Sequence, residues 1–158
     1  MQLAIILPPL KANALEELRF EPLFTTRVCL AVSCEHAFAK KQSVSLVDAA
    51  REPFIGLTRE DYPRYFEYLS AIFARVHDKP RVVEEHDGWS GVFSAIGAGT
   101  GVALTSEKFT YAFNDRIKLL RLTPEPKRVT IGIITRKGRL SPAAEKFWQC
   151  AKVAASSE

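Results

Sequence analysis

The densest group of side chains that can do chemistry is Glu84-Glu85-His86-Asp87, in which three carboxylates adjoin one imidazole. Such a group can bind a metal ion or act in acid–base catalysis. It also lies at the carboxyl end of a predicted strand, where Asp87 is placed to cap the helix that follows. Because of this position we favour the polar edge of a binding cleft over a catalytic or metal centre.

The other candidate nucleophiles and ligands lack partners at the required spacing. No serine lies in a G-x-S-x-G motif, H-E-x-x-H is absent, and Cys34-Glu35-His36 brings cysteine and histidine too close together for a triad. Cys29, Cys34 and Cys150 form neither a C-x-x-C pair nor a complete zinc set, and we expect all three to be reduced and buried. The sequence therefore predicts no catalytic residue, no metal and no cofactor.

The glycines of Gly97-Ala98-Gly99-Thr100-Gly101 resemble a dinucleotide-binding motif in composition only. That motif must leave a strand and begin a helix, so that backbone N–H groups meet the pyrophosphate. Here the glycines end a helical pattern and precede a strand. We interpret them as a tight turn.

The spacing of apolar residues and of breakers predicts an alternating α/β order. A predicted helix with Asp61 as its cap and Pro63 in its first turn carries an apolar stripe as far as Val76, and another runs from Trp89 to Gly97 or Gly99. Ser45 is predicted to cap a short helical turn. The alternation favours parallel βαβ units. The predicted strands are 3–7, 27–33, 53–57, 81–85, 101–105, 117–122 and 129–135, and two further helices cover 106–113 and the segment after Ser141-Pro142.

In open parallel sheets, ligands bind beyond the carboxyl ends of the strands. These ends carry hydroxyl, imidazole and backbone groups but no evident nucleophile, so we expect binding rather than catalysis. The predicted ligand-binding residues are Pro8, Leu57, Thr58, His86, Asp87, Gly88 and Thr105.

Composition describes an ordinary globular chain. Its 158 residues are 47% apolar and 25% charged, and the formal net charge of +4 comes from scattered basic residues. Direct nucleic-acid binding needs a concentrated basic face, so we do not expect it of this chain. With no membrane-length apolar run and no signal peptide pattern, we expect a cytoplasmic location without membrane contact.

Seven phrases in series resemble the effector-binding domain of LysR-type transcription regulators. Two of them, Ser45–Ala49 and Glu52–Ile55, match the family's pattern closely, and the seven together cover nearly the whole chain in the correct order. They are Phe20–Phe24, Val28–Val32, Glu35–Ala39, Ser45–Ala49, Glu52–Ile55, Gly97–Leu104, and Ser141-Pro142 with Ala144 and Phe147.

The resemblance implies a type 2 periplasmic-binding-protein-like α/β fold of two α/β subdomains joined by two hinge-crossing strands. Residues 1–26 and 125–158 would form a partial, incomplete first subdomain, and residues 27–124 would form the second. The winged helix-turn-helix that begins such regulators has no counterpart here, so we expect a fragment, an engineered piece or a truncated reading frame of such a regulator. The full-length regulator is expected to contact DNA only through that domain. The full-length protein is expected to form a homo-oligomer.

The implied function is to sense a small polar metabolite in the cleft between the subdomains. Two other functions stay open at this point. One is a small-molecule enzyme that uses residues 84–87, and the other is a free-standing solute-binding protein.

Overall fold

The computed structural model describes residues 3–6, 18–112, 115–138 and 140–156. The chain divides into two compact units, and each is described here by itself. Unit 1 comprises Met1–Thr26 and Arg128–Glu158, and unit 2 comprises Arg27–Lys127. The divisions lie after Thr26 and after Lys127, and the expected assignment of residues 1–26 and 125–158 to one subdomain and 27–124 to another stays a prediction.

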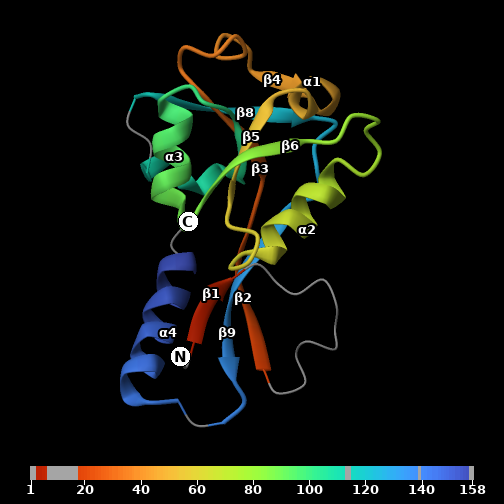
Figure 1. The fold of residues 1–158 in the computed structure, drawn as a ribbon. Coiled ribbons are helices and arrows are strands. Elements are labelled where there is room, and N and C mark those ends of the chain that lie inside the picture. The colour runs from red at the N-terminus through yellow and green to blue at the C-terminus, as the bar shows by residue number, and fades with distance from the viewer. Residues whose placement is uncertain (1–2, 7–17, 113–114, 139, 157–158) are drawn as a thin grey trace. The chain divides into compact units, whose positions relative to one another are not determined.

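Unit 1 is built on a three-stranded antiparallel sheet in the order β1-β9-β2 (Figure 1). Its strands are β1 (Leu3–Ile6), β2 (Leu18–Thr26) and β9 (Val129–Arg136). The helix α4 (Pro142–Ser156) begins as predicted, because the Ser141 hydroxyl accepts the N–H of Ala144 at 3.3 Å. Ala144 and Trp148, four residues apart on one face of α4, are both 9% exposed and form its buried side.

Unit 2 contains one four-stranded and one two-stranded sheet. The larger has the order β4-β8-β3-β7, and in the smaller β5 pairs with β6. The strands are β3 (Val28–Ser33), β4 (Ser43–Ser45), β5 (Pro53–Leu57), β6 (Arg81–His86), β7 (Ala103–Ser106) and β8 (Ile117–Thr123).

The pairing of unit 2 departs in part from the expected parallel βαβ units, because β7 pairs with β3 in the antiparallel sense. β5–β6 and β4–β8 are parallel, but β3 is antiparallel to both β7 and β8. Only Arg27 separates β3 from β2, so β3 is not preceded by the helical crossover that a parallel βαβ unit requires.

The helices of unit 2 confirm two predicted boundaries and correct two caps. Ser45 accepts the Asp48 N–H at 3.0 Å and caps α1 (Leu46–Ala50), and a positive φ of 79° at Gly99 follows the end of α3 (Trp89–Gly97). The cap residue of α2 (Pro63–Ile72) is Tyr62, and that of α3 is Gly88, neither with a side-chain bond. Asp61 and Asp87 are therefore not caps.

The predicted helix after Ser106 is a 3-10 helix, η2 (Glu107–Ala112). The helix α2 is shorter than its apolar stripe predicted, because the chain turns away at Phe73. There the Lys79 ammonium group donates to the carbonyls of Phe73, Ala74 and Val76 at 3.0, 3.1 and 2.6 Å. These bonds satisfy carbonyls at the end of the helix.

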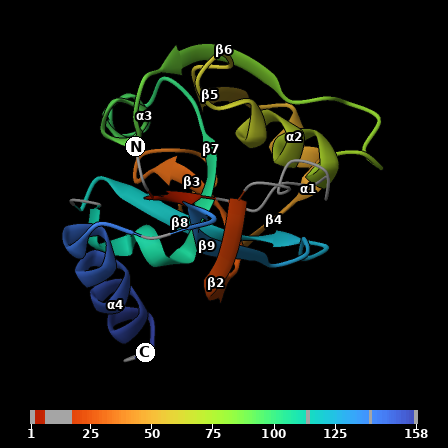
Figure 2. The same cartoon turned by 90° about the horizontal axis from the view of Figure 1, so that it is seen from below.

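The core of unit 2 lies where α2 and α3 flank β5 and β6 and meet the larger sheet (Figure 2). Tyr65 and Phe66 of α2 join the inner face of α3 in this cluster, and Trp89 packs against it. The predicted packing of the second helix into the core is thereby confirmed. The buried members are Ala31, Ile55, Leu57, Tyr65, Phe66, Val92, Phe93, Ala95, Ile96 and Ala103.

The three cysteines are free thiols, as expected, but only Cys29 is buried. Cys34 and Cys150 are exposed, because Cys34 follows the end of β3 and Cys150 lies on the outer side of α4. The described helices include none that is long and apolar enough to cross a membrane.

Candidate functional site

The carboxyl ends of β5 and β6 meet at one edge of unit 2. In their parallel pairing Leu57 is opposite His86, and the Thr58 N–H donates to the His86 carbonyl at 2.8 Å. Asp87 and Gly88 follow directly and lead into α3. Five of the residues predicted to bind ligand are thus neighbours, whereas Pro8 lies outside the described residues.

The loop after β5 is tied to this edge by hydrogen bonds, two of which involve residues outside the predicted ligand-binding set, Arg59 and Tyr62. The Thr58 hydroxyl donates to Asp61 Oδ2 at 3.0 Å, so the hydroxyl oxygen is left as an acceptor. The Arg59 N–H donates to Glu85 Oε2 at 2.9 Å, and the Tyr62 hydroxyl donates to the Asp87 carbonyl at 3.1 Å. The place of Tyr62, just before the proline that starts α2, was the available signal for its role.

The acidic cluster of residues 84–87 does not converge on one point. His86 Nε2 lies 2.8 Å from Glu84 Oε1, while Glu85 is engaged by the loop after β5. The His86 ring lies against the first turn of α3, since a Cβ on Gly91 would stand 2.7 Å from His86 Nδ1. Among the described residues no group of three or more His, Cys, Asp or Glu side chains is arranged to hold a metal ion.

The amino end of α3 provides hydrogen-bond donors at the same edge. Its cap residue, Gly88, has no side chain, and the first helical bond runs from the Val92 N–H to the Gly88 carbonyl at 3.3 Å. The N–H groups ahead of Val92 therefore have no side-chain cap, and they coincide with the positive end of the helix dipole. A polar ligand with an acceptor atom fits this end.

Thr105 belongs to the larger sheet, but a short parallel bridge aligns β7 with β5. Phe54 pairs with Val102, with bonds of 2.8 Å from the Ile55 N–H to the Val102 carbonyl and 2.9 Å from the Val102 N–H to the Pro53 carbonyl. Leu57 and Thr105 each lie three residues beyond this bridge, at the same height along the two parallel segments. Parallel alignment therefore directs the carboxyl ends of β5, β6 and β7 the same way.

The Thr105 side chain is 4% exposed, and its hydroxyl oxygen has no hydrogen-bond partner within the structure. Strand alternation places it on the face of β7 that carries Ala103, a core residue. Its cross-strand neighbour is Cys29, and burial raises the pKa of that thiol to about 11, so the thiol is uncharged at neutral pH. A buried hydroxyl without a partner is rare in folded proteins.

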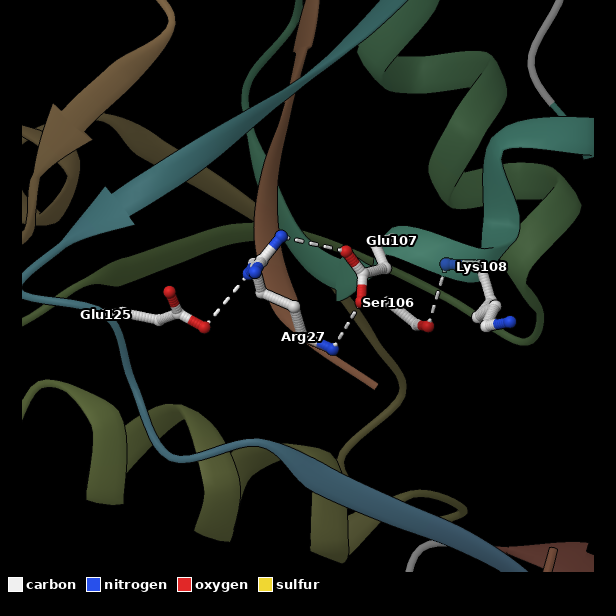
Figure 3. A network of polar contacts seen from close by, with 5 residues as sticks. All are labelled: Arg27, Ser106, Glu107, Lys108 and Glu125. Atoms are coloured by element: carbon white, nitrogen blue, oxygen red, sulfur yellow. Dashed lines mark hydrogen bonds and ion pairs between the residues drawn. The ribbon is translucent and has the colours of Figure 1, made fainter. Parts of the chain in front are cut away.

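The segment that follows Thr105 is anchored by a polar network (Figure 3). Glu107 accepts the Arg27 backbone N–H at 3.0 Å and the Arg27 guanidinium at 3.2 Å, while Arg27 Nε donates to Glu125 at 2.9 Å. The Ser106 hydroxyl accepts the Lys108 N–H at 3.1 Å. These bonds fix the start of η2 and hold Thr105 at the end of β7.

Comparison with known proteins gives one family and a consistent set of relatives. The model of the LysR substrate binding domain matches residues 1–156. The HTH-type transcriptional regulator AlsR of Bacillus subtilis is 22% identical over 93% of the chain and 48% of its own length. The transcriptional dual regulator GltC of the same organism is 29% identical over 80% of the chain and 42% of its own length. The chain thus spans about half the length of these curated relatives.

Solved structures agree in fold. The effector-binding domain of QuiR in complex with shikimate superposes with a TM-score of 0.75 at 18% identity, over 99% of this chain and 73% of that one. The regulatory domain of Synechocystis PCC6803 CcmR in complex with 2-PG gives 0.76 at 17% identity, over 98% and 73%. The periplasmic-binding-protein-like α/β fold predicted from the sequence is thereby confirmed.

Proposed function

The chain belongs to the LysR substrate-binding domain family, and from this membership we propose that it is the effector-binding part of a bacterial transcription regulator. The observation that carries the proposal is the match of the family's model across residues 1–156. Its curated relatives are transcription regulators, and two proteins of the same fold hold the small molecules shikimate and 2-PG. The function we infer is recognition of a small metabolite.

The effector contacts unit 2 where β5, β6 and β7 end. Thr105 supplies a buried hydroxyl with no other partner, and Thr58 supplies a hydroxyl oxygen that can accept. The uncapped N–H groups at the start of α3 supply further donors. Glu85 and Asp87 oppose a strongly anionic ligand at this edge, so the chemistry favours a small polar metabolite with few charges.

We expect the full-length protein to contain further parts that this chain needs in order to regulate transcription. We infer that units 1 and 2 correspond to parts of the two subdomains, that the full-length protein is a homo-oligomer, and that it contacts DNA through a helix-turn-helix domain. Because a bacterial regulator acts on DNA, the proposal includes a cytoplasmic location. The proposed function includes no catalytic step. In support, Glu85 accepts the Arg59 N–H, while Glu84 pairs with His86, so the acidic side chains do not act on one point.

The test is a thermal-shift screen of this chain against small hydroxylated acids and their neutral analogues, followed by calorimetry. We expect a subset to raise the melting temperature, because a ligand that binds only the folded state stabilises it. Thr105→Val should weaken binding, whereas Thr100→Val, whose hydroxyl donates to the Ala95 carbonyl at the far end of α3, should not. Equal effects of the two variants would contradict the assignment of the site.

A further inference from the structure

We propose that unit 2 carries a second ligand site beside α3, which takes a small planar aromatic carboxylate. Residues of α3, η2 and the start of β8 line a cavity of about 560 Å³ that opens to solvent. This volume lies within the range of small-molecule pockets. Thr58, His86 and Thr105 are not among its lining residues, so it is distinct from the effector site.

One wall of the cavity is aromatic. The rings of Trp89 and Phe93 are stacked, with centroids 5.3 Å apart and an interplanar angle of 25°, and Phe109 lies 5.5 Å from Trp89. Phe93 is 8% exposed and fixed in the core, whereas Trp89 and Phe109 are only partly buried. Such rings present flat apolar faces on which another planar ring stacks favourably.

The other end of the cavity carries a positive charge. Arg116 lines it beside Gly97, where a Cβ would lie 3.8 Å from the Arg116 Cβ. Within the described residues no carboxylate lines the cavity or forms an ion pair with Arg116. A guanidinium with no ionic partner at the end of an aromatic wall matches a ring that bears a carboxylate.

Three of the carbonyls near the carboxyl end of α3 already accept hydrogen bonds. The carbonyls of Ser94, Ala95 and Ile96 accept the N–H groups of Ala98, Thr100 and Gly99 at 3.0, 3.2 and 2.9 Å. The full positive charge of the Arg116 guanidinium exceeds the partial negative charge at this end of the helix dipole.

Two other cavities of the described structure lack this combination. A cavity of about 450 Å³ beside α2 includes Glu85, and its Arg59 guanidinium already lies 3.8 Å over the Phe66 ring. A cavity of about 310 Å³ beside α4 includes Glu145, and Arg19 lies 4.8 Å over the Trp148 ring. In both, the arginine and the lysine of the wall are already engaged, and a carboxylate in the wall repels an anion.

The probe is 2-naphthoate, and its uncharged control is 2-naphthamide. The chain has two tryptophans, and only Trp89 lines this cavity, while Trp148 belongs to α4. In ¹⁵N-resolved NMR spectra, assigned with Trp148→Phe, naphthoate should shift the Trp89 indole N–H saturably and leave that of Trp148 in place. Calorimetry supplies the dissociation constants.

Variants separate charge from shape. Arg116→Gln should weaken naphthoate binding at least about tenfold and leave naphthamide binding unchanged, because only the carboxylate uses the guanidinium. Arg121→Gln, another exposed arginine, is the matched control and should change neither. Ser94→Leu, an exposed position on the cavity wall, should fill the space and abolish binding of both probes.

Three outcomes would overturn the proposal. The first is no saturable shift of the Trp89 indole at millimolar naphthoate. The second is equal affinity of the Arg116→Gln and Arg121→Gln variants for naphthoate. The third is loss of binding on Thr105→Val, because that result would place naphthoate in the effector site instead.

Discussion

Replacing Thr105 by valine should make the ligand-free protein more stable and its effector complex weaker. Valine has nearly the shape of threonine and lacks the hydroxyl that stands at 4% exposure without a hydrogen-bond partner. A buried polar group with no partner costs about 1–3 kcal/mol, so its removal should raise the free energy of unfolding by about 1 kcal/mol. With a urea m-value of about 2 kcal/mol/M, the unfolding midpoint should rise by about 0.5 M.

The assay is urea unfolding followed by Trp89 fluorescence in a Trp148→Phe background, so that unit 2 alone is observed. Thr100→Val is the matched control, because its hydroxyl donates to the Ala95 carbonyl at 3.1 Å. Loss of that bond should lower the free energy of unfolding by about 1 kcal/mol. The two threonine-to-valine changes should therefore shift the midpoint in opposite directions.

In the effector complex, Thr105→Val should be unfavourable, because the hydroxyl then bonds to the ligand. Loss of a hydrogen bond to the ligand should raise the dissociation constant by about 5- to 30-fold, equivalent to ~1–2 kcal/mol. A midpoint lowered as much by Thr105→Val as by Thr100→Val would refute the reasoning, since it would mean that the Thr105 hydroxyl is bonded in the free protein. Unchanged effector affinity would show that Thr105 lies outside the site.

The remaining predictions concern thiols and close packing. Cys34 and Cys150, both exposed, should react rapidly with a disulfide reagent at pH 8, and Cys29 only after unfolding; equal rates for all three would contradict its burial. Because burial raises the pKa of Cys29 from 9.0 to about 11, the unfolded thiol ionises first, so the free energy of unfolding should fall between about pH 9 and pH 11. Chemical denaturation measured at several pH values in that range should show a smaller fall in the free energy of unfolding for Cys29→Ala than for the unmodified protein. Gly101→Ala should destabilise unit 2 by about 1–3 kcal/mol, because its Cβ would stand 2.5 Å from a backbone carbonyl of β5. Gly97→Ala, whose Cβ would have contacts of 3.8 Å or more, should leave the stability unchanged. Calorimetric melting of the two variants distinguishes these outcomes.

The order of elements and several of their ends were predictable because they depend on residues a few positions apart. Ser45 reaches the Asp48 N–H within one turn, and Gly99 supplies the positive φ that ends α3. The same local reasoning failed at the start of α2, where Asp61 has the right type and place for a cap. Its carboxylate is instead taken by the Thr58 hydroxyl, a competitor that a helix-capping pattern does not include.

The sequence by itself determined the family, the alternating order of strands and helices, and the proximity of Thr58 to His86 through the parallel strands that precede them. Tertiary structure alone decided that β7 pairs antiparallel with β3 and that Cys29 therefore lies opposite Thr105, 76 positions away. It also decided that the Thr105 hydroxyl is buried without a partner and that Arg116 comes to the end of an aromatic wall. Side-chain periodicity reports only which face of its own element a residue occupies, whereas the partners across that face come from distant segments and are set by the packing of the whole unit.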